Sequence, residues 1–595
     1  MDIENMREIV LSYPKLNERI ESRENPKSER AKAIKNLDEM RADFSEAYIK
    51  TLEKLLDASL PKLYDGINFE THGVDFAQLC KDSCVVVVPN HQSHADYLAI
   101  NYVVYKKFRF PLYVAGGNNL NIFPLGTLFR KSGCFFIRRS FANDATYKLT
   151  MEAYLYYLLK EGKPVEFFFE GGRTRTGKLL SPRFGLYHML LNAHSALIKA
   201  GDERPLTFVP VSIAHEYVPE QKSLVKEMGG GKKKKESTGQ LLGLLKLFAY
   251  QFGSVHINLG KPINAPGLKE READLKEATH KTAFKCFREV GNNMVVTPTS
   301  LLALVLLDEP SGALIWNDIL SKARAVIDYC EKFEVPYVDS LKSRKFEKTL
   351  ERAVDILIGN KKIDVMGRGT QGHKFYTIKD ECRGELLYFK NSILHHFLIP
   401  SIINTAWISL FNGSTQNVND LKKIFLEQRN QLKHEFYLPT VKQFFYKTLT
   451  IVSDGVGRRI TNLDDCMKLT QQELYSLVSK IGVFSRVLSY INEAYYSSAL
   501  AIKELNNEKG FRTESHIKRA QEIFDEEKNI GRVIKYPESF SPPLCRSSLK
   551  YFTHKNLIEN DGGSFKITNE TKFDKIIIKY HKDLEDRLRF NIRVQ

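Results

Sequence analysis

The chain has 595 residues, more than one hydrophobic core usually holds, so two or more domains are expected. Hydrophobic residues make up 43% and charged residues 27%, which excludes a generally disordered chain. The formal net charge of +17 favours anionic partners, namely nucleic acid, an anionic lipid surface or phosphorylated substrates. The chain lacks paired Cys/His zinc spacing and a basic region followed by leucine heptads, so no nucleic-acid partner is expected.

The cysteines and the apolar segments bear on the cellular compartment. Eight cysteines are scattered without a Cys-x-x-Cys pair, which favours free thiols in a reducing cytosol. Residues 1–30 lack the apolar core of a signal peptide, and no window of eighteen clearly apolar residues predicts a conventional transmembrane helix. Ile393–Phe411 contains no Asp, Glu, Lys or Arg. It is interpreted either as a buried helix pair broken at Pro400 or as an interfacial membrane contact.

Residues 1–80 have the pattern of charged helices, and strands then begin to alternate with helices. The first predicted strand is Cys84–Pro89, a β-branched run typical of fully buried strands. Further strands are predicted at Phe110–Ala115, Cys134–Arg138, Val165–Phe169, Thr207–Ile213 and Val255–Leu259. Helices are predicted after His91 and at Thr146–Lys160 and Gly185–Lys199. This alternation predicts an α/β domain over residues 81–290, with a mixed, buried sheet flanked by helices.

The helical period dominates from residue 291 onward, so residues 291–595 are predicted to form a mainly helical C-terminal domain. The predicted helices are Ser300–Leu307, Ile315–Phe333, Lys342–Ile358, Val418–Glu435 and Thr470–Glu504. A turn or small sheet is expected at Lys361–Thr377, and a helix followed by a hairpin at Leu544–Thr568. The basic segment Gly229–Lys235 is interpreted as a solvated loop or as one attracted to phosphate.

The first candidate motif is Pro89–Asp96 (PNHQSHAD), which directly follows a predicted buried strand, where function usually lies in α/β sheets. His91 and Asp96 could approach each other across the strand-to-helix turn. A carboxylate on one imidazole nitrogen fixes the tautomer and leaves the other nitrogen free to accept a proton. Without an obvious serine nucleophile, the pair is interpreted as a base that deprotonates a substrate hydroxyl, which then attacks a carbonyl. A chance spacing and a metal site that includes His94 are the alternatives.

The second motif, Gly133–Arg139 (GCFFIRR), is a predicted strand that ends in paired arginines. The guanidinium groups of Arg138 and Arg139 offer a rigid fork of donors that matches phosphate oxygens. Two solvated surface arginines are the ordinary alternative. Because the pair closes a buried apolar strand, phosphate recognition is the favoured interpretation.

The third motif, Phe167–Lys178 (FFFEGGRTRTGK), joins an aromatic strand to a glycine-rich turn that carries Arg173, Arg175 and Lys178. Glycines let backbone amides approach a bound anion, and the three cations add charge. The spacing differs from that of a Walker loop. We interpret the motif as a phosphate-binding turn, with an ordinary basic surface loop as the alternative. A fourth segment, Phe208–Ile213, is an apolar strand with a proline and by itself indicates only core.

Taken in order, these blocks resemble the glycerolipid acyltransferase family. Its members carry a His-x4-Asp block, then Gly-x-x-Phe-Ile-x-Arg, then Phe-x-Glu-Gly-x-Arg-Ser-Arg, then a Val-Pro-x-x-x strand. The matching segments here are His91–Asp96, Gly133–Arg139, Phe168–Arg175 and Val209–Ile213. The chain is most similar to the glycerol-3-phosphate and dihydroxyacetone-phosphate acyltransferase branch, through Ala115–Arg139 and Phe169–Leu180. The resemblance runs from about Val85 to Pro262, and more faintly through Thr297–Leu307.

Some positions depart from that branch. The sequence Asn-His-Gln-Ser at 90–93 is similar to lysophosphatidic acid acyltransferases. Those enzymes tend to have Ile-Asp-Arg where this chain has Ile137-Arg138-Arg139, and their third block generally lacks the double glycine. Thr174 stands where serine is usual. The resemblance therefore implies a three-carbon phosphate as the acceptor, with lysophosphatidic acid as an alternative.

The resemblance also implies roles for the matching residues. His91 would be the general base, and Asp96 would orient it and stabilise its charge. The phosphorylated acceptor would be held by Arg139, Glu170, Gly171, Arg173 and Arg175, with Arg138 and Lys178 as helpers. Pro210 would lie near the acyl donor. No metal and no organic cofactor would be required.

The implied function is transfer of a fatty acyl group from acyl-CoA or acyl-carrier protein to glycerol 3-phosphate, giving lysophosphatidic acid in phospholipid biosynthesis. The protein would be peripheral or monotopic at the cytoplasmic face of a membrane, in contact with its phospholipid surface. Dihydroxyacetone phosphate and lysophosphatidic acid are the alternative acceptors. A non-catalytic basic protein that binds lipid or nucleic acid is disfavoured by the intact His91 and Asp96. A thioesterase, which activates water, would not need the arginine-rich third block.

Overall fold

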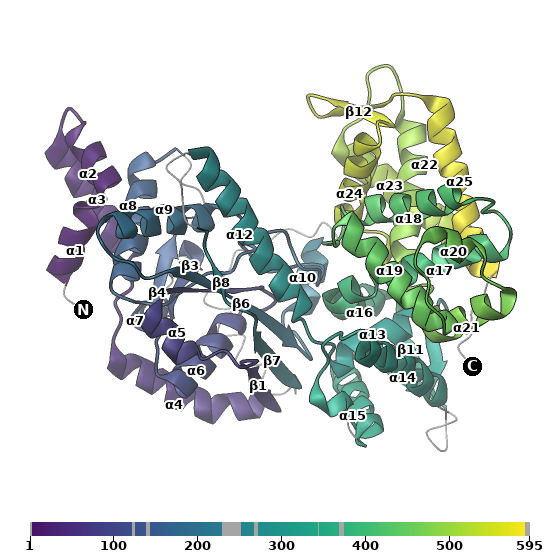
Figure 1. Ribbon diagram of the computed structural model, residues 1–595, viewed down its shortest axis with the longest axis horizontal. Coiled ribbons are helices and arrows are strands. Elements are labelled where there is room, and N and C mark those ends of the chain that lie inside the picture. Colours follow the sequence, from purple (N-terminus) through teal and green to yellow (C-terminus); the bar gives the residue numbers. More distant parts are fainter. Residues whose placement is uncertain are drawn as a thin grey trace. The chain divides into compact units, whose positions relative to one another are not determined.

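The computed structural model describes residues 3–121, 125–138, 143–228, 252–266, 272–342, 344–367 and 374–589. By its contacts the chain divides into two compact units, which Figure 1 colours along the sequence. The first unit comprises Met1–Thr174, Leu179–Pro219 and Lys234–Met294. The second comprises Arg175–Lys178, Glu220–Lys233 and Val295–Gln595. The basic segment 229–235 lies outside the described residues.

The first unit is built on an eight-stranded mixed sheet with the order β1-β7-β6-β2-β5-β3-β4, in which β8 also pairs with β6. Its strands are β1 (Gly66–Glu70), β2 (Cys84–Pro89), β3 (Tyr113–Gly117), β4 (Cys134–Ile137), β5 (Val165–Glu166), β6 (Leu206–His215), β7 (Ser254–Leu259) and β8 (Ile263–Asn264). Within the group β2 to β6, every pair of neighbouring strands is parallel. Strands β7 and β8 are antiparallel to β6. The predicted mixed, buried sheet is therefore confirmed.

Two features of the sequence explain how these strands lie. All residues of β2 and β6 are buried, as expected for runs that are apolar on both faces. Pro210 lies inside β6, where one side of the strand changes partner. On that side, pairing with β8 ends at Phe208 and pairing with β7 begins at Val211. The missing N–H of Pro210 therefore breaks no ladder bond on that side, and its carbonyl accepts from Gly260 N at 2.8 Å. Strand β3 begins only at Tyr113, because Pro111 has no N–H to donate.

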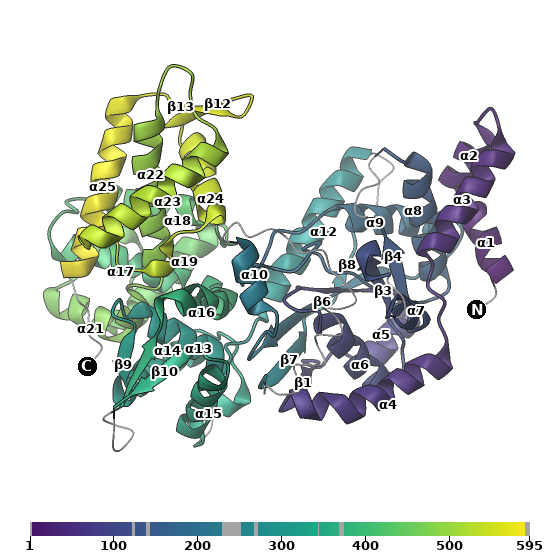
Figure 2. The same cartoon turned by 180° about the vertical axis from the view of Figure 1, so that it is seen from behind.

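Helices cover both faces of this sheet. Figures 1 and 2 show α8, α9 and α12 on one side and α4, α5 and α6 on the other, with α1 to α3 beside α8. The helical elements are α1 (Ile3–Leu11), α2 (Pro14–Glu21), α3 (Pro26–Met40), α4 (Glu46–Leu63), α5 (Phe76–Asp82), α6 (Asp96–Phe108), η1 (Asn118–Leu120), α7 (Leu125–Lys131), α8 (Ala145–Lys160), α9 (Gly185–Lys199) and α12 (Glu272–Asn292). Residues 1–80 lie within the first unit because β1 pairs with β7. The division at residues 80 and 290 stays a prediction.

The second unit is mainly helical, as predicted. Its helices are α10 (Gln221–Met228), α13 (Pro298–Asp308), α14 (Trp316–Lys332), α15 (Phe346–Gly359), α16 (Asp380–Ile393), α17 (Leu398–Phe411), α18 (Val418–Leu432), α19 (Val441–Val456), α20 (Leu463–Met467), α21 (Gln471–Ile481), α22 (Ser489–Leu505), α23 (Thr513–Ile530), α24 (Pro542–His554) and α25 (Glu570–Arg589). The 3-10 turns are η3 (Asp339–Leu341), η5 (Leu394–His396), η6 (Gly482–Phe484) and η7 (Pro537–Ser539). A three-stranded sheet contains β9 (Ala313–Ile315), β10 (Ile363–Met366) and β11 (Phe375–Ile378), and a hairpin contains β12 (Ile558–Asp561) and β13 (Ser564–Ile567).

One predicted helix of this unit is divided in two. The segment Thr470–Glu504 forms α21 and α22, separated by the 3-10 turn η6. In this turn Phe484 is fully buried, and its ring stacks on that of Phe397 with 4.9 Å between centroids. Burying this aromatic side chain favours the turn over a continuous helix.

The apolar segment Ile393–Phe411 contains a bend. Among the described residues, no single helix is long and apolar enough to cross a membrane, but Asp380–His396 and Leu398–Phe411 pass that test as a pair bent by 82°. The break falls at Phe397 and not at Pro400. Pro400 lies in the first turn of α17, where its missing N–H breaks no helical bond. Most of α17 is buried within the second unit.

Candidate active site

The candidate site lies at the carboxyl edge of the central strands of the first unit. Strands β5, β2 and β6 are neighbours and run parallel, so their carboxyl ends meet at one edge of the sheet. This is the edge at which open α/β sheets bind ligands. His91 follows β2, Glu170 follows β5, and His215 is the last residue of β6.

Asp96, the first residue of α6, organises the turn after β2. Its Oδ2 accepts from the backbone N–H groups of Gln92 at 2.6 Å and Ser93 at 2.9 Å, and from His91 Nδ1 at 2.8 Å. Its Oδ1 accepts from His215 Nε2 at 2.6 Å. Burial of this 0% exposed carboxyl acts to raise its pKa, but the hydrogen bonds from His215 and His91 outweigh burial and hold the pKa below its ordinary value. Asp96 is therefore an ionised carboxylate shared by two imidazoles.

The predicted approach of His91 to Asp96 is thus present. Because Asp96 occupies Nδ1, Nε2 is the nitrogen that remains to accept a proton. The His91 ring stacks on Phe168 with 4.1 Å between centroids, and its side chain is 13% exposed. The N–H of Thr174 donates to the carbonyl of His91 at 2.9 Å. The first and third motifs therefore fix the imidazole from two sides, while its roles in catalysis stay a prediction.

The first and fourth motifs are joined through Asn90. Its side-chain Nδ2 donates to Ile213 O at 3.0 Å, and its Oδ1 accepts from Ile213 N at 2.8 Å. Asn90 is 1% exposed, so these bonds form in a dry interior where they are costly to lose. This clamp fixes the end of β2 beside β6 and explains why an asparagine precedes His91.

Glu170 and Gly171 shape the turn after β5. Glu170 is buried, and its Oε1 accepts from Leu180 N at 3.2 Å. Burial raises its pKa well above the ordinary value, and the nearby negative charge of Asp96 adds to this shift. Gly171 has a φ of +68°, and an added Cβ would lie 3.0 Å from Arg183 Cγ. This left-handed turn favours glycine.

The cations of the third motif have different surroundings. Arg173 is half-buried and belongs to the first unit. Arg175 and Lys178 belong to the second unit, where Arg175 Nε lies 3.1 Å from Glu227 Oε2 and Lys178 Nζ lies 2.5 Å from Glu435 Oε2. Both side chains of the Lys178 pair are buried. Two of the predicted phosphate ligands therefore have carboxylate partners of their own, and their roles toward an acceptor stay predictions.

Arg138 lies apart from His91. It follows β4, which is three strand positions from β2, or about 14 Å at the usual strand spacing. Its Nε donates to Glu39 Oε1 at 2.9 Å, and its guanidinium lies 4.2 Å from the centre of the Tyr147 ring. These contacts bind β4 to α3, and substrate binding by Arg138 stays a prediction. Arg139 lies outside the described residues.

Sequence reasoning missed His215. The strand predicted for the fourth motif ended at Ile213, whereas β6 continues for two residues and ends at this histidine. The available signal was a histidine and a glutamate, His215 and Glu216, at the end of a mainly apolar strand. In the described part of the chain, no group of three or more His, Cys, Asp or Glu side chains is placed to hold a metal ion.

Glu166, at the end of β5, allows a test of the electrostatics of this edge. It is 0% exposed, burial raises its pKa well above the ordinary value, and Asn101 Nδ2 donates to its Oε2 at 3.0 Å. The folded state thus keeps a proton that the unfolded state loses above about pH 4.3, so the free energy of unfolding falls as the pH rises toward the folded pKa. We expect Glu166→Gln to flatten this fall between pH 5 and 8.

Urea unfolding followed by far-ultraviolet circular dichroism measures this slope. The matched control is Glu161→Gln. Glu161 is exposed and lies in the turn between α8 and β5, five residues before Glu166. The control should keep the wild-type slope. An unchanged slope in Glu166→Gln would show that this carboxyl is not held protonated.

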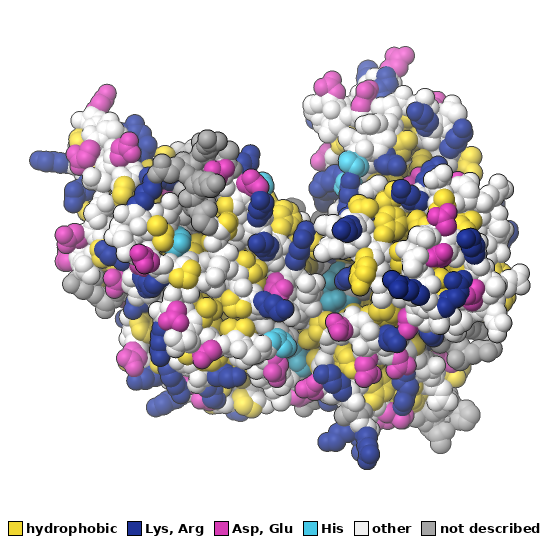
Figure 3. All heavy atoms as spheres, viewed as in Figure 1, with side chains coloured by type: hydrophobic (Ala, Val, Ile, Leu, Met, Phe, Trp, Pro, Cys, Tyr) yellow, Lys and Arg dark blue, Asp and Glu magenta, His cyan; other side chains and the backbone are white. Residues whose placement is uncertain are grey.

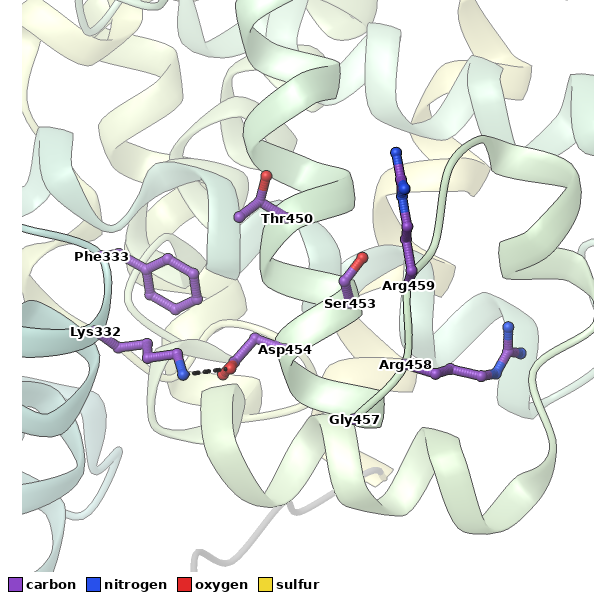
Figure 4. A pocket seen from close by; sticks show the side chains of 8 residues that line it. All are labelled: Lys332, Phe333, Thr450, Ser453, Asp454, Gly457, Arg458 and Arg459. Atoms are coloured by element: carbon purple, nitrogen blue, oxygen red, sulfur yellow. Dashed lines mark ion pairs between the residues drawn. The ribbon is translucent and has the colours of Figure 1, made fainter.

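A pocket of about 490 Å³ lies within the second unit (Figure 4). It is lined by Lys332, Phe333, Thr450, Ser453, Asp454, Gly457, Arg458 and Arg459. Lys332 Nζ lies 2.9 Å from Asp454 Oδ1, which partly neutralises its basic lining. The lining contains no residue of the four sequence motifs, so this pocket is separate from the site at the sheet edge.

Comparison with known proteins decides the family. A profile of the glycerol-3-phosphate acyltransferase C-terminal region matches residues 224–561, which is more than half of the chain, and an acyltransferase profile matches residues 69–214. This chain belongs to the glycerol-3-phosphate acyltransferase family. The resemblance indicated by the four motifs is thereby confirmed.

Two curated relatives that match this chain are longer than it is. The glycerol-3-phosphate acyltransferase from Pseudoalteromonas translucida is 28% identical over 559 residues, which are 90% of this chain and 65% of the relative. That from Shewanella denitrificans is 30% identical over 78% of this chain and 56% of the relative. The crystal structure of the 1-acyl-sn-glycerophosphate acyltransferase PlsC from Thermotoga maritima is 19% identical over 41% of this chain and 79% of that chain, with a TM-score of 0.25. The chain spans about two thirds or less of the length of these two curated relatives.

Proposed function

We propose that this protein is a glycerol-3-phosphate 1-O-acyltransferase that transfers a fatty acyl group from acyl-CoA or acyl-carrier protein to glycerol 3-phosphate. The observation that carries the proposal is the His91–Asp96 pair at the carboxyl edge of the sheet, in a chain of this family. Asp96 binds Nδ1 and leaves Nε2 to act as the base. Relatives that carry this name support the choice of substrate.

The chemistry follows from the ionised state of Asp96. His91 Nε2 takes the proton of the acceptor hydroxyl. The hydroxyl oxygen attacks the thioester carbonyl at the same time, and a carbon–oxygen bond forms. The tetrahedral intermediate then expels the thiolate of the donor, which takes the proton back from His91. The buried negative charge of Asp96 stabilises the imidazolium that exists between these two steps. This sequence requires no cofactor and no covalent enzyme intermediate.

The third motif supports binding of a phosphorylated acceptor. The turn that contains Arg173 also places Thr174 N on the carbonyl of His91, so Arg173 is in the same turn that fixes the base. A guanidinium next to the base would hold the acceptor phosphate and direct the hydroxyl to Nε2. Dihydroxyacetone phosphate and lysophosphatidic acid carry the same phosphate chemistry and are the alternative acceptors.

The proposed reaction takes place at a membrane surface, because its product carries an acyl chain that partitions into a bilayer. We propose a peripheral attachment at the cytoplasmic face. On the face drawn in Figure 3, basic side chains are interspersed with acidic ones over both units. On this face, the described cations do not gather along the single track that a nucleic-acid-binding surface would need.

The test offers glycerol 3-phosphate, dihydroxyacetone phosphate and lysophosphatidic acid separately to the purified protein, with palmitoyl-CoA or palmitoyl-carrier protein as donor. We expect the lowest KM for glycerol 3-phosphate. We expect Arg173→Ala to raise that KM by about 10- to 100-fold with a smaller change in kcat, because a charged hydrogen bond is worth about 1.5–3 kcal/mol.

The matched control is Lys199→Ala, which removes an exposed positive charge at the end of α9, at the opposite edge of the sheet. An unchanged KM in Arg173→Ala would contradict the phosphate site. Transfer to none of the acceptors from either donor would contradict the proposed function.

A further inference from the structure

A second histidine shares the carboxylate that orients His91. His215 Nε2 lies 2.6 Å from Asp96 Oδ1, while His91 Nδ1 lies 2.8 Å from Oδ2. The side chains of His215 and Asp96 are both 0% exposed. One buried carboxylate is thus held between two imidazoles, of which only His91 has an exposed portion.

The two oxygens of Asp96 have unequal surroundings. Three donors converge on Oδ2, namely the N–H groups of Gln92 and Ser93 and His91 Nδ1. A carboxylate oxygen has two lone pairs, so Oδ2 has no capacity for a further donor. His215 is the donor to Oδ1, on the opposite side of the carboxylate. His215 therefore supplies the hydrogen bond that holds Oδ1, while the other three donors hold Oδ2.

The surroundings of the other nitrogen of His215 indicate its tautomer. Nδ1 is buried and has no hydrogen-bond partner among the described residues. A proton there would be an unsatisfied buried donor, whereas a bare nitrogen costs less. The geometry therefore places the donated proton on Nε2, where it binds Asp96 Oδ1.

Other titratable side chains lie near Asp96, His91 and His215. Burial raises the pKa of the Glu166 and Glu170 carboxyls well above the ordinary value, which favours their protonated, uncharged forms. Tyr64, at the end of α4, lies 6.4 Å from His215 ring to ring. Glu216 points to His256, with 3.6 Å between its Oε1 and the imidazole Nε2.

We propose that His215 is a positioning residue that fixes the Asp96 carboxylate and thereby sets the pH at which His91 works as a base. The inference rests on the proposed function. Without a donor on Oδ1, the buried carboxylate would hold the proton on the His91–Asp96 pair more tightly, because less of its charge would be offset. The pair would then remain protonated up to a higher pH, and the carboxylate would no longer be fixed in one plane.

Two substitutions separate this role from simple filling of space. His215→Phe keeps a ring of similar size but removes the hydrogen-bond donor to Asp96. His215→Gln keeps an amide N–H at about the position of the imidazole Nε2, and its side chain cannot titrate. We expect His215→Phe to lower kcat by about 10-fold or more, to leave both KM values within about two-fold, and to move the acidic limb of the pH–rate profile to higher pH. We expect His215→Gln to restore most of kcat and the wild-type acidic limb.

His256→Gln is the matched control. His256 is buried in the adjacent strand β7, opposite Ala214 in the register, and it contacts Asn68 and not Asp96. Its pH–rate profile should match the wild type. Wild-type profiles in all three variants would overturn the proposal. So would a folded His215→Gln protein that is as impaired as His215→Phe, with folding confirmed by the urea midpoint.

A measurement without substrate separates this inference from the proposed function. Diethyl pyrocarbonate reacts with neutral imidazole, so the rate of His91 modification against pH, read by peptide mass spectrometry, reports its protonation. We expect the midpoint to move to higher pH in His215→Phe and to stay in place in His215→Gln and His256→Gln. Absence of acyl transfer in every protein would reject the proposed function alone. An unmoved midpoint in His215→Phe would reject the role of His215.

Discussion

Replacing His91 with alanine is expected to lower kcat for acyl transfer by about three orders of magnitude. A positioned general base contributes about 10²- to 10⁴-fold to a rate, and His91 has the geometry for this role, with Asp96 on Nδ1 and Nε2 available. His215 does not replace it, because its side chain is 0% exposed and its Nε2 donates to Asp96. Steady-state kinetics with glycerol 3-phosphate and palmitoyl-CoA measure the loss.

The same substitution should leave the fold intact. The His91 side chain is 13% exposed and gives Asp96 only one of the four hydrogen bonds that the carboxylate accepts. Its other contact is the stack on Phe168. The urea midpoint should therefore stay close to that of the wild type.

His581→Ala provides the control for a histidine outside the site. His581 lies on α25 in the second unit, with its ring 5.9 Å from that of Tyr496. The kcat of the His581→Ala variant should equal the wild-type value. Retention of more than about a tenth of kcat in His91→Ala would contradict the assignment of the base, since even the weakest general bases contribute more.

The parts of the site that the sequence predicted are those formed by local contacts. His91 and Asp96 lie within one strand-to-helix turn, so their approach follows from a buried strand that ends at Pro89. His215 is 119 residues from Asp96 and reaches it only because β6 pairs with β2. That pairing follows from how the whole sheet is assembled, and strand patterns along the chain do not encode strand order.

The same limit explains the basic residues of the second and third motifs. Composition shows three cations in a glycine-rich turn, but it cannot show which carboxylates fold against them. Glu435 is 257 residues from Lys178, and Glu39 is 99 residues from Arg138. Ion pairs with such distant partners bind one element to another, so a cation at a motif position can serve the fold and need not contact a substrate.

The second unit should depend strongly on a buried ion pair between α16 and η7. Arg383 Nε lies 2.6 Å from Glu538 Oε2, Arg383 Nη2 lies 3.0 Å from Glu538 Oε1, and the two side chains are 1% and 0% exposed. Removing one partner leaves the other charge buried and unpaired, which costs about 3–5 kcal/mol. We therefore expect Glu538→Leu or Arg383→Met alone to lower the free energy of unfolding of this unit by that amount.

Urea unfolding followed by tryptophan fluorescence isolates the second unit, because Trp316 and Trp407 are the two tryptophans of the chain and both lie there. The double variant Arg383→Met/Glu538→Leu removes both charges and should be more stable than either single variant. Lys503→Met breaks an exposed pair with Asp574 and should cost less than about 1 kcal/mol. A double variant as unstable as the two single losses added together would show that the side chains act independently and that their pairing does not stabilise the unit.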